Sequence, residues 1–211
     1  MLFGEKPKKS VKGSLLIARL QFIQHLKLNW MEILKQLPAP ELRKMIKGNY
    51  TLEEYFATPD HMLRMISSAT WYDCSIYNAL IKAMIVQAKK EKNLTTEQVC
   101  IDSGKFTAQS HLKGLMAYVL GWGSVERTIS LISKGWGSYY SEGEIVNIKN
   151  TPGDAQVNVI INYLIPELQY ITVGYFQKVL ETKAIKDFVV RSNYTVDAGG
   201  TFQYFITWKP Q

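Results

Sequence analysis

Three histidines and two cysteines are the residues of this sequence best suited to metal binding or nucleophilic catalysis. His25, His61 and His111 are widely separated, and the chain contains neither a His-Glu-x-x-His pair nor a Cys-x-x-Cys pair. Cys74 and Cys100 stand in apolar stretches with helical character, so we expect two small buried thiols rather than a disulfide. The sequence predicts no metal site and no cofactor.

Motifs typical of hydrolases and nucleotide-binding enzymes are also missing. Neither Gly-x-Ser-x-Gly nor the Walker phosphate loop occurs. The segment 121–124 (Gly-Trp-Gly-Ser) precedes an expected helix whose N–H groups could bind an anion, but Ser124 as a helix N-cap accounts for it without a ligand. We therefore expect a protein that is not an enzyme, with no catalytic residues.

Aromatic residues form the most informative group, because they gather near the ends of expected elements rather than along their apolar stripes. They are Trp71, Tyr72, Trp122, Trp136, Tyr139 and Tyr140. Such residues can line an apolar ligand pocket. They can equally fill the core of a helix-on-sheet domain. Gly174, inside an expected helix, completes this candidate pocket set, and close packing on a neighbouring segment is its expected use.

The net charge of +7 comes from the start of the chain. Residues 1–50 hold ten lysines and arginines against three acids, and the remainder is balanced. Lys6, Lys8, Lys9 and Lys12 lie in a segment of low apolar content, so we expect residues 1–10 to be a mobile basic tail, and removal of residues 1–12 to leave the fold intact. A solvated tail and an electrostatic tether to an anionic partner are both open; a nucleic-acid-binding face is not expected.

The first half of the chain reads as a series of helices. Apolar spacing and capping residues predict helices over 14–28, 30–37, 40–48, from 51, 59–68, 74–88, from 95, and 124–133, with an apolar stripe running to residue 121. Asp73 is the expected N-cap of the longest helix. No stretch approaches the roughly 20 apolar residues that cross a bilayer, and the start lacks the features of a secretory signal, so we expect a cytoplasmic protein.

The last third changes to strands. Two hairpins are predicted, 144–150 with 156–164 and 188–196 with 202–208, and a helix opened by Pro166 separates them. We predict an α+β fold in which N-terminal helices pack on a four-stranded antiparallel sheet with the C-terminal order strand-strand-helix-strand-strand. The expected organisation is a single domain, 11–209, with a helical subregion 11–137 and a sheet subregion 138–209.

The order of these features resembles one bacterial family. The features are a Trp-Tyr-Asp start to a long helix, a Gly-Trp-Gly-Ser-Tyr-Tyr-x-x-Gly segment, a hairpin, a glycine-containing helix and a last hairpin ending Phe-x-Ile-Thr-Trp. Over roughly residues 11–209 the chain resembles a paralogous family abundant in myxobacteria. The C-terminal half of that family is similar to the NO-signalling and Golgi-transport ligand-binding superfamily, which includes vinyl-reductase-type sensor domains and haem-dependent NO-binding domains.

This resemblance implies a non-enzymatic regulatory module that binds a small hydrophobic or aromatic ligand in a helix-sheet pocket. The trafficking members imply the alternative, a ligand-free docking or scaffold protein acting through a homodimer or a protein partner. The haem branch carries a Tyr-x-Ser-x-Arg clamp, whereas here Tyr139 to Glu142 are followed by Gly143. The resemblance therefore disfavours a haem or metal cofactor in this chain.

Overall fold

The computed structural model describes residues 7–46, 48–112, 123–161, 163–195 and 200–210. The chain divides into two compact units. Unit 1 comprises Met1–Val99 with Tyr139–Ser141, and unit 2 comprises Cys100–Ser138 with Glu142–Gln211. Whether the two fold as the one domain predicted from the sequence stays a prediction, and so does the packing of the N-terminal helices on the sheet.

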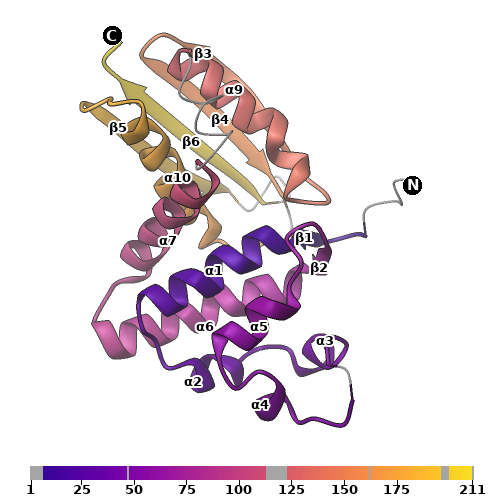
Figure 1. Ribbon diagram of the computed structural model, residues 1–211. Helices are drawn as coiled ribbons and strands as arrows, with labels where there is room; N and C mark the ends of the chain where they lie inside the picture. Colours follow the sequence, from indigo (N-terminus) through magenta and orange to yellow (C-terminus); the bar gives the residue numbers. More distant parts are fainter. Residues whose placement is uncertain (1–6, 47, 113–122, 162, 196–199, 211) are drawn as a thin grey trace. The chain divides into compact units, whose positions relative to one another are not determined.

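Unit 1 is a group of helices with one small sheet. Its helices are α1 (Gly13–His25), α2 (Trp30–Leu34), α3 (Ala39–Arg43), α4 (Leu52–Tyr55), α5 (Pro59–Met65), α6 (Cys74–Lys92) and the start of α7 (Thr96–His111) (Figure 1). The core lies between α1, α5 and α6, where Leu16, Leu20, Leu80 and Ile81 are fully buried. The predicted apolar stripes therefore form this core.

Local capping explains where these helices begin. The carboxylate of Asp73 accepts a hydrogen bond from the Ser75 N–H at 2.8 Å, as predicted for the start of α6. Thr51 and Glu54 form the reciprocal capping box of α4. After α6, Asn93 takes the left-handed conformation that ends many helices.

The small sheet of unit 1 was not predicted. Strands β1 (Ser10–Lys12) and β2 (Trp71–Asp73) pair antiparallel, with Val11 opposite Tyr72. Val11 also bridges to Tyr140. Since Val11 is fully buried, this three-segment arrangement is part of the unit 1 core.

Unit 2 contains a four-stranded antiparallel sheet in the order β3-β4-β6-β5. The strands are β3 (Glu144–Thr151), β4 (Asp154–Ile160), β5 (Phe188–Thr195) and β6 (Thr201–Trp208). Both predicted hairpins are confirmed, as β3 with β4 and β5 with β6. The predicted strand-strand-helix-strand-strand order is confirmed as well, because α10 (Leu168–Thr182) lies between them in sequence.

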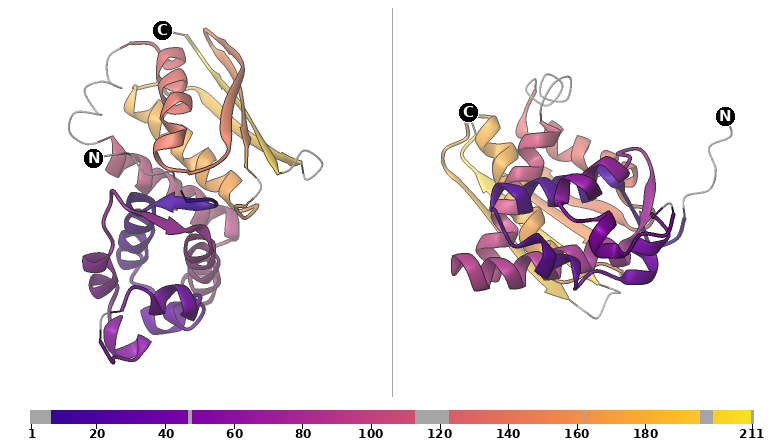
Figure 2. Two further views of the ribbon diagram at one scale, coloured as in Figure 1. Left: turned by 90° about the vertical axis from the view of Figure 1, so that its right-hand side faces the viewer. Right: turned by 60° about the horizontal axis from the view of Figure 1, so that its bottom comes forward.

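Helices α9 (Val125–Gly135) and α10 lie on the same face of this sheet (Figure 2, left). Helix α9 packs on β3 and α10 on β5, and the short 3-10 helix η1 (Trp136–Ser138) follows α9. Strand β6 alternates accordingly: Phe202, Tyr204 and Ile206 are fully buried beneath the helices, whereas Phe205 is 41% exposed on the other face.

Helices α7 and α10 approach each other through two glycines. A Cβ on Gly174 would lie 2.0 Å from the Ile101 carbonyl oxygen, and a Cβ on Gly104 would lie 1.9 Å from the Ile171 carbonyl oxygen. The packing role predicted for Gly174 is therefore confirmed. Gly104 makes the reciprocal contact.

The apolar stripe expected over 113–121 lies outside the described residues. In the described part of the chain, no helix combines the length and the apolar character needed to cross a membrane. Both cysteines are buried thiols, as expected.

Candidate functional site

Trp71 and Lys12 form one part of the predicted aromatic set in unit 1. The Lys12 ammonium lies 4.3 Å from the centroid of the Trp71 ring, and its Nζ donates to the Ala69 carbonyl oxygen at 2.6 Å. Opposite positions on β1 and β2 bring the two side chains together. A cation over an indole face is attracted by the ring's negative face, so this pair stabilises the small sheet.

Tyr72 and Tyr140 flank Val11 in the same sheet. The Tyr72 hydroxyl accepts a hydrogen bond from the Ser67 N–H at 3.0 Å. Tyr140 is buried, and burial raises the pKa of the neighbouring Tyr139 phenol. The structure thus brings Trp71, Tyr72, Tyr139 and Tyr140 together in unit 1, through a sheet that the sequence did not reveal.

The remaining members of the predicted pocket set belong to unit 2 or are not described. Trp136, in η1, is buried. Gly174 packs on the backbone of α7, and its lining of a pocket stays a prediction. Trp122 lies outside the described residues.

The basic segment is tied to unit 1 more closely than the sequence indicated. Lys6 lies outside the described residues, and the side chains of Lys8 and Lys9 are exposed. However, the Lys9 carbonyl accepts from the Cys74 N–H at 3.0 Å, and Lys12 belongs to β1. The expectation that removal of residues 1–12 would leave the fold intact is therefore corrected, because that truncation deletes β1 and its buried Val11.

A buried phenol lies on the inner face of the unit 2 sheet. Tyr204 is fully buried, its ring packs on Phe176 of α10 with centroids 5.7 Å apart, and Thr172 of α10 is near its hydroxyl. Burial raises the pKa of Tyr204 far above its usual range, and the Thr172 hydroxyl opposes only part of that shift. The phenol therefore stays protonated, and the alternation of β6 was the signal that could have placed it inside.

Two buried polar side chains in unit 1 were also missed. Arg19 is 1% exposed, because it shares the buried stripe of α1 with Leu16 and Ile23. Gln87 of α6 is 3% exposed. Buried groups of this kind are normally hydrogen-bonded, and Gln87 shows how.

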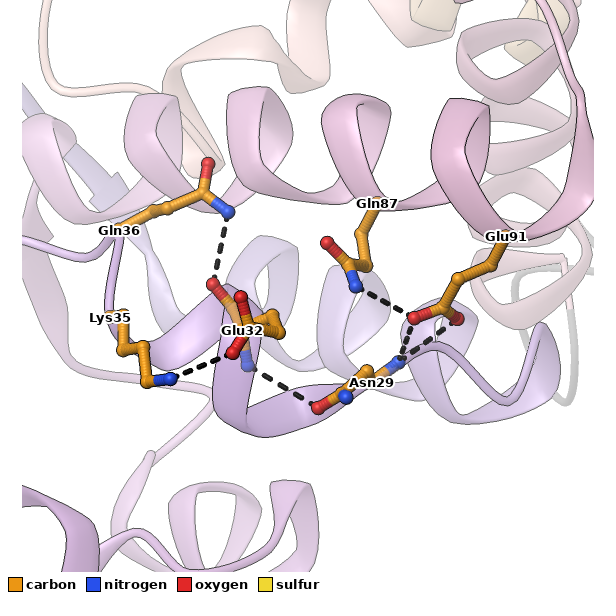
Figure 3. Close-up of polar contacts among 6 residues, drawn as sticks. All are labelled: Asn29, Glu32, Lys35, Gln36, Gln87 and Glu91. Atoms are coloured by element: carbon orange, nitrogen blue, oxygen red, sulfur yellow. Dashed lines mark hydrogen bonds and ion pairs between the residues drawn. The ribbon is translucent and has the colours of Figure 1, made fainter.

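Gln87 belongs to a polar cluster that joins α2 to α6 (Figure 3). Its Nε2 donates to the Glu91 carboxylate at 2.6 Å, and both Glu91 oxygens accept from the Asn29 N–H at 3.2 Å. The Asn29 side chain in turn accepts from the Glu32 N–H. Glu91 thus links the start of α2 to α6, and this cluster holds the two helices together.

Metal-binding clusters are not found in the described residues: no three His, Cys, Asp or Glu side chains meet there. His25, His61 and His111 belong to three different helices, α1, α5 and α7.

The segment that would correspond to a haem propionate clamp is used for structure. Ser141 Oγ accepts from the Ser10 N–H at 2.8 Å, and the Ser141 N–H donates to the Ser10 carbonyl at 3.0 Å. At the position of the expected arginine, Gly143 has φ +88°, and a Cβ there would lie 2.6 Å from the Ile160 carbonyl oxygen. Neither the backbone nor the space suits an arginine side chain. These residues do not fit a haem.

Comparisons with known proteins identify the fold. The sequence matches no protein-family model, and comparison with curated protein sequences also finds no match. The structure is similar to that of an Fe(II) unliganded H-NOX protein from K. algicida, with a TM-score of 0.60 and 8% identity over 95% of this chain and 97% of that one.

Two further solved H-NOX structures are similar. One comes from work on heme distortion in the H-NOX family, with a TM-score of 0.64 and 9% identity over 95% of this chain and 96% of that one. The other is an oxygen-binding H-NOX domain related to soluble guanylate cyclases, with a TM-score of 0.62 and 9% identity over 94% and 96% of the two chains. The α+β fold expected from the NO-signalling superfamily is thus confirmed; membership of the myxobacterial-type family or of the vinyl-reductase-type branch stays a prediction.

Proposed function

We propose that this chain is a regulatory module that binds a small hydrophobic or aromatic molecule and does not transform it. The observation that carries the proposal is the likeness of its fold, over 95% of the chain, to H-NOX structures. One of these is an oxygen-binding domain related to soluble guanylate cyclases, a use of this fold in ligand binding.

The proposed ligand is not haem. A haem sensor on this fold would need a charged partner for the propionates at the position of Gly143, where a side chain would collide with Ile160. The Ser141 hydroxyl is already bonded to the backbone of β1. We infer that the segment 139–143 anchors β1, and that the ligand contacts other residues.

Aromatic side chains are the proposed contacts of the ligand, since flat apolar rings bind hydrophobic molecules with little loss of conformational entropy. In unit 1 the candidates are Trp71, Tyr72, Tyr139 and Tyr140, and in unit 2 Trp136.

The exposed Lys8 and Lys9 are the proposed salt-sensitive contact with an anionic partner. A Lys8→Gln/Lys9→Gln variant would test this contact without removing β1.

Native mass spectrometry of the full chain purified from its own host tests the function. We expect a fraction of the protein to carry an extra non-covalent mass that disappears on denaturation and is reduced in a Trp136→Leu variant. A Trp30→Leu variant serves as the control, since Trp30 is equally buried but bonded to the Phe56 carbonyl inside unit 1. A mass that is always that of the bare chain would overturn the proposal.

Titration with haemin tests the exclusion of haem separately. We expect no stoichiometric Soret band from the folded chain. A one-to-one complex with a sharp Soret maximum would show that haem is the ligand and that the reasoning from Gly143 is wrong.

The alternative function is a docking or scaffold protein that acts through a homodimer and binds no small molecule. One observation favours it, the open edge of the unit 2 sheet at β5. An oligomer that forms while the native mass stays that of the bare protein would select this alternative.

A further inference from the structure

The two edges of the unit 2 sheet differ in how they are protected. Edge strand β3 has a register shift between Asn147 and Lys149. Bulges and outward lysines are devices by which proteins prevent edge strands from pairing with other chains. Edge strand β5 pairs with β6 in unbroken register over all eight of its residues and has no proline. Among the described residues, β5 is the last strand on this side of the sheet (Figure 1).

The outward face of β5 is apolar at its beginning. Val189 is 46% exposed, among the most exposed large hydrophobic residues described. Beside it is an open hollow of about 390 Å³ lined by Asp187, Phe188, Val189, Thr207, Trp208 and Lys209. The Asp187 carbonyl accepts from the Lys209 N–H at 3.1 Å, so the β5–β6 ladder continues by one residue before Phe188.

Charges of opposite sign flank Val189. Asp187, Val189 and Arg191 are two residues apart, so they point to the same face of the strand. The side chains of Asp187 and Arg191 are exposed, and the ion pair of Asp187 with Lys209 is largely exposed to solvent. An exposed ion pair of this kind contributes little and is easily exchanged.

We propose that residues 188–190 of β5 pair antiparallel with the same residues of a second copy of this chain, about a two-fold axis through Val189. Directly opposite residues of antiparallel strands point to the same face and come within about 5.5 Å. The axis therefore places the two Val189 side chains against each other and sets Asp187 opposite Arg191 of the second copy, twice.

Other two-fold registers lose this complementarity. An axis through Arg191 would set two arginines against each other. An axis through Asn193 would leave Asp187 without an opposite charge. A strand from another protein would have to supply the same alternation of acid, apolar residue and base, which a second copy contains by construction. This inference does not depend on the proposed ligand.

A charge exchange tests the pairing by sedimentation equilibrium of the full chain between about 5 and 200 μM at low salt. Arg191→Asp places acids opposite acids at both positions, and Asp187→Arg places arginines opposite arginines. We expect each to weaken dimerisation at least about tenfold. The double exchange Asp187→Arg/Arg191→Asp restores the opposite charges, and we expect a dissociation constant within about threefold of the original. Arg127→Asp, an equal charge change on α9, is the control and should leave dimerisation unaltered.

A cysteine scan tests the register. Val189→Cys should form an intermolecular disulfide with itself under mild oxidation, whereas Asn193→Cys, exposed on the same face, should not, since its counterpart would be about 26 Å away along the strands. A wild-type chain that is monomeric at about 200 μM overturns the proposal. So does a double exchange no better than either single variant, or crosslinking at residue 193 in place of 189.

Discussion

The close approach of α7 and α10 makes Gly174→Ala a sharp test of the unit 2 packing. The added methyl group would lie 2.0 Å from the Ile101 carbonyl oxygen, where an ordinary contact begins at 3.4 Å. The obstructing atom is backbone, so no side-chain rotation relieves the overlap. Helices α7 and α10 must separate by a large part of the missing 1.4 Å, the difference between these two distances.

The expected magnitude follows from two opposing effects. Alanine favours a helix interior over glycine by about 1 kcal/mol. Overpacking of a well-filled interior costs about 1–3 kcal/mol, and contact with a rigid backbone atom favours the upper end. We expect a net loss of about 2 kcal/mol in the free energy of unfolding, measured from the urea midpoint at unchanged m-value.

Two further variants make this result specific. Gly135→Ala, at the last residue of α9, has no atom within 4 Å of the new Cβ and should be neutral or slightly stabilising. Gly104→Ala should be destabilised like Gly174→Ala. The double variant should lose less free energy of unfolding than the two single variants together, because helices that one methyl group has already separated accommodate a second at lower cost. A Gly174→Ala protein as stable as the original would refute the contact.

Two other changes act on polar contacts. Glu91→Ala removes the acceptor shared by Asn29 and the buried Gln87, so we expect a loss of about 1–2 kcal/mol and faster amide exchange in α2, measured by denaturation and hydrogen exchange. For Glu181, desolvation is outweighed by the hydrogen bond and charge of Lys105, so its pKa is lowered in the folded protein. Its contribution to stability is then present above the unfolded pKa near 4.5 and lost as the pH falls through the lowered folded pKa. The difference in stability between Glu181→Gln and the original at pH 7 should therefore shrink as the pH falls below 4.5.

The elements that the sequence revealed are those with local signals. The hairpins of unit 2 follow from β-branched strands around short turns, and α6 follows from its apolar stripe and the cap at Asp73. In each case the interacting residues are close in sequence. Local propensity and tertiary structure therefore give the same answer.

The small sheet of unit 1 had no such signal. Strands β1 and β2 have three residues each, and their register brings together positions about 60 residues apart, with Tyr140 more distant still. Three residues are too few to show alternation. The lysines around β1 suggested a solvated tail. However, Lys12 contacts Trp71 and Ala69, and Val11 is buried. Composition alone therefore predicted an exposed segment where burial makes it part of unit 1.

The predicted pocket residues were only partly brought together for the same reason. Trp71 and Tyr72 were selected as flanking a helix, and it is β1 that connects them to Tyr139 and Tyr140. Gly174 was selected for its place inside a helix, a signal of close packing that α7 satisfies. A sequence pattern identified which residues were unusual; it could not say which of the two units each would join.

The segment from Tyr139 to Gly143 is used for structure and does not form a clamp for carboxylates. A serine hydroxyl and an arginine at fixed spacing can hold carboxylates only if both side chains are free to face them. Here the Ser141 hydroxyl and N–H are both engaged by Ser10, and Gly143 turns the chain with a positive φ against Ile160. An arginine at this position would have to displace the end of β4. The segment therefore supplies no serine-arginine pair for carboxylates in this chain.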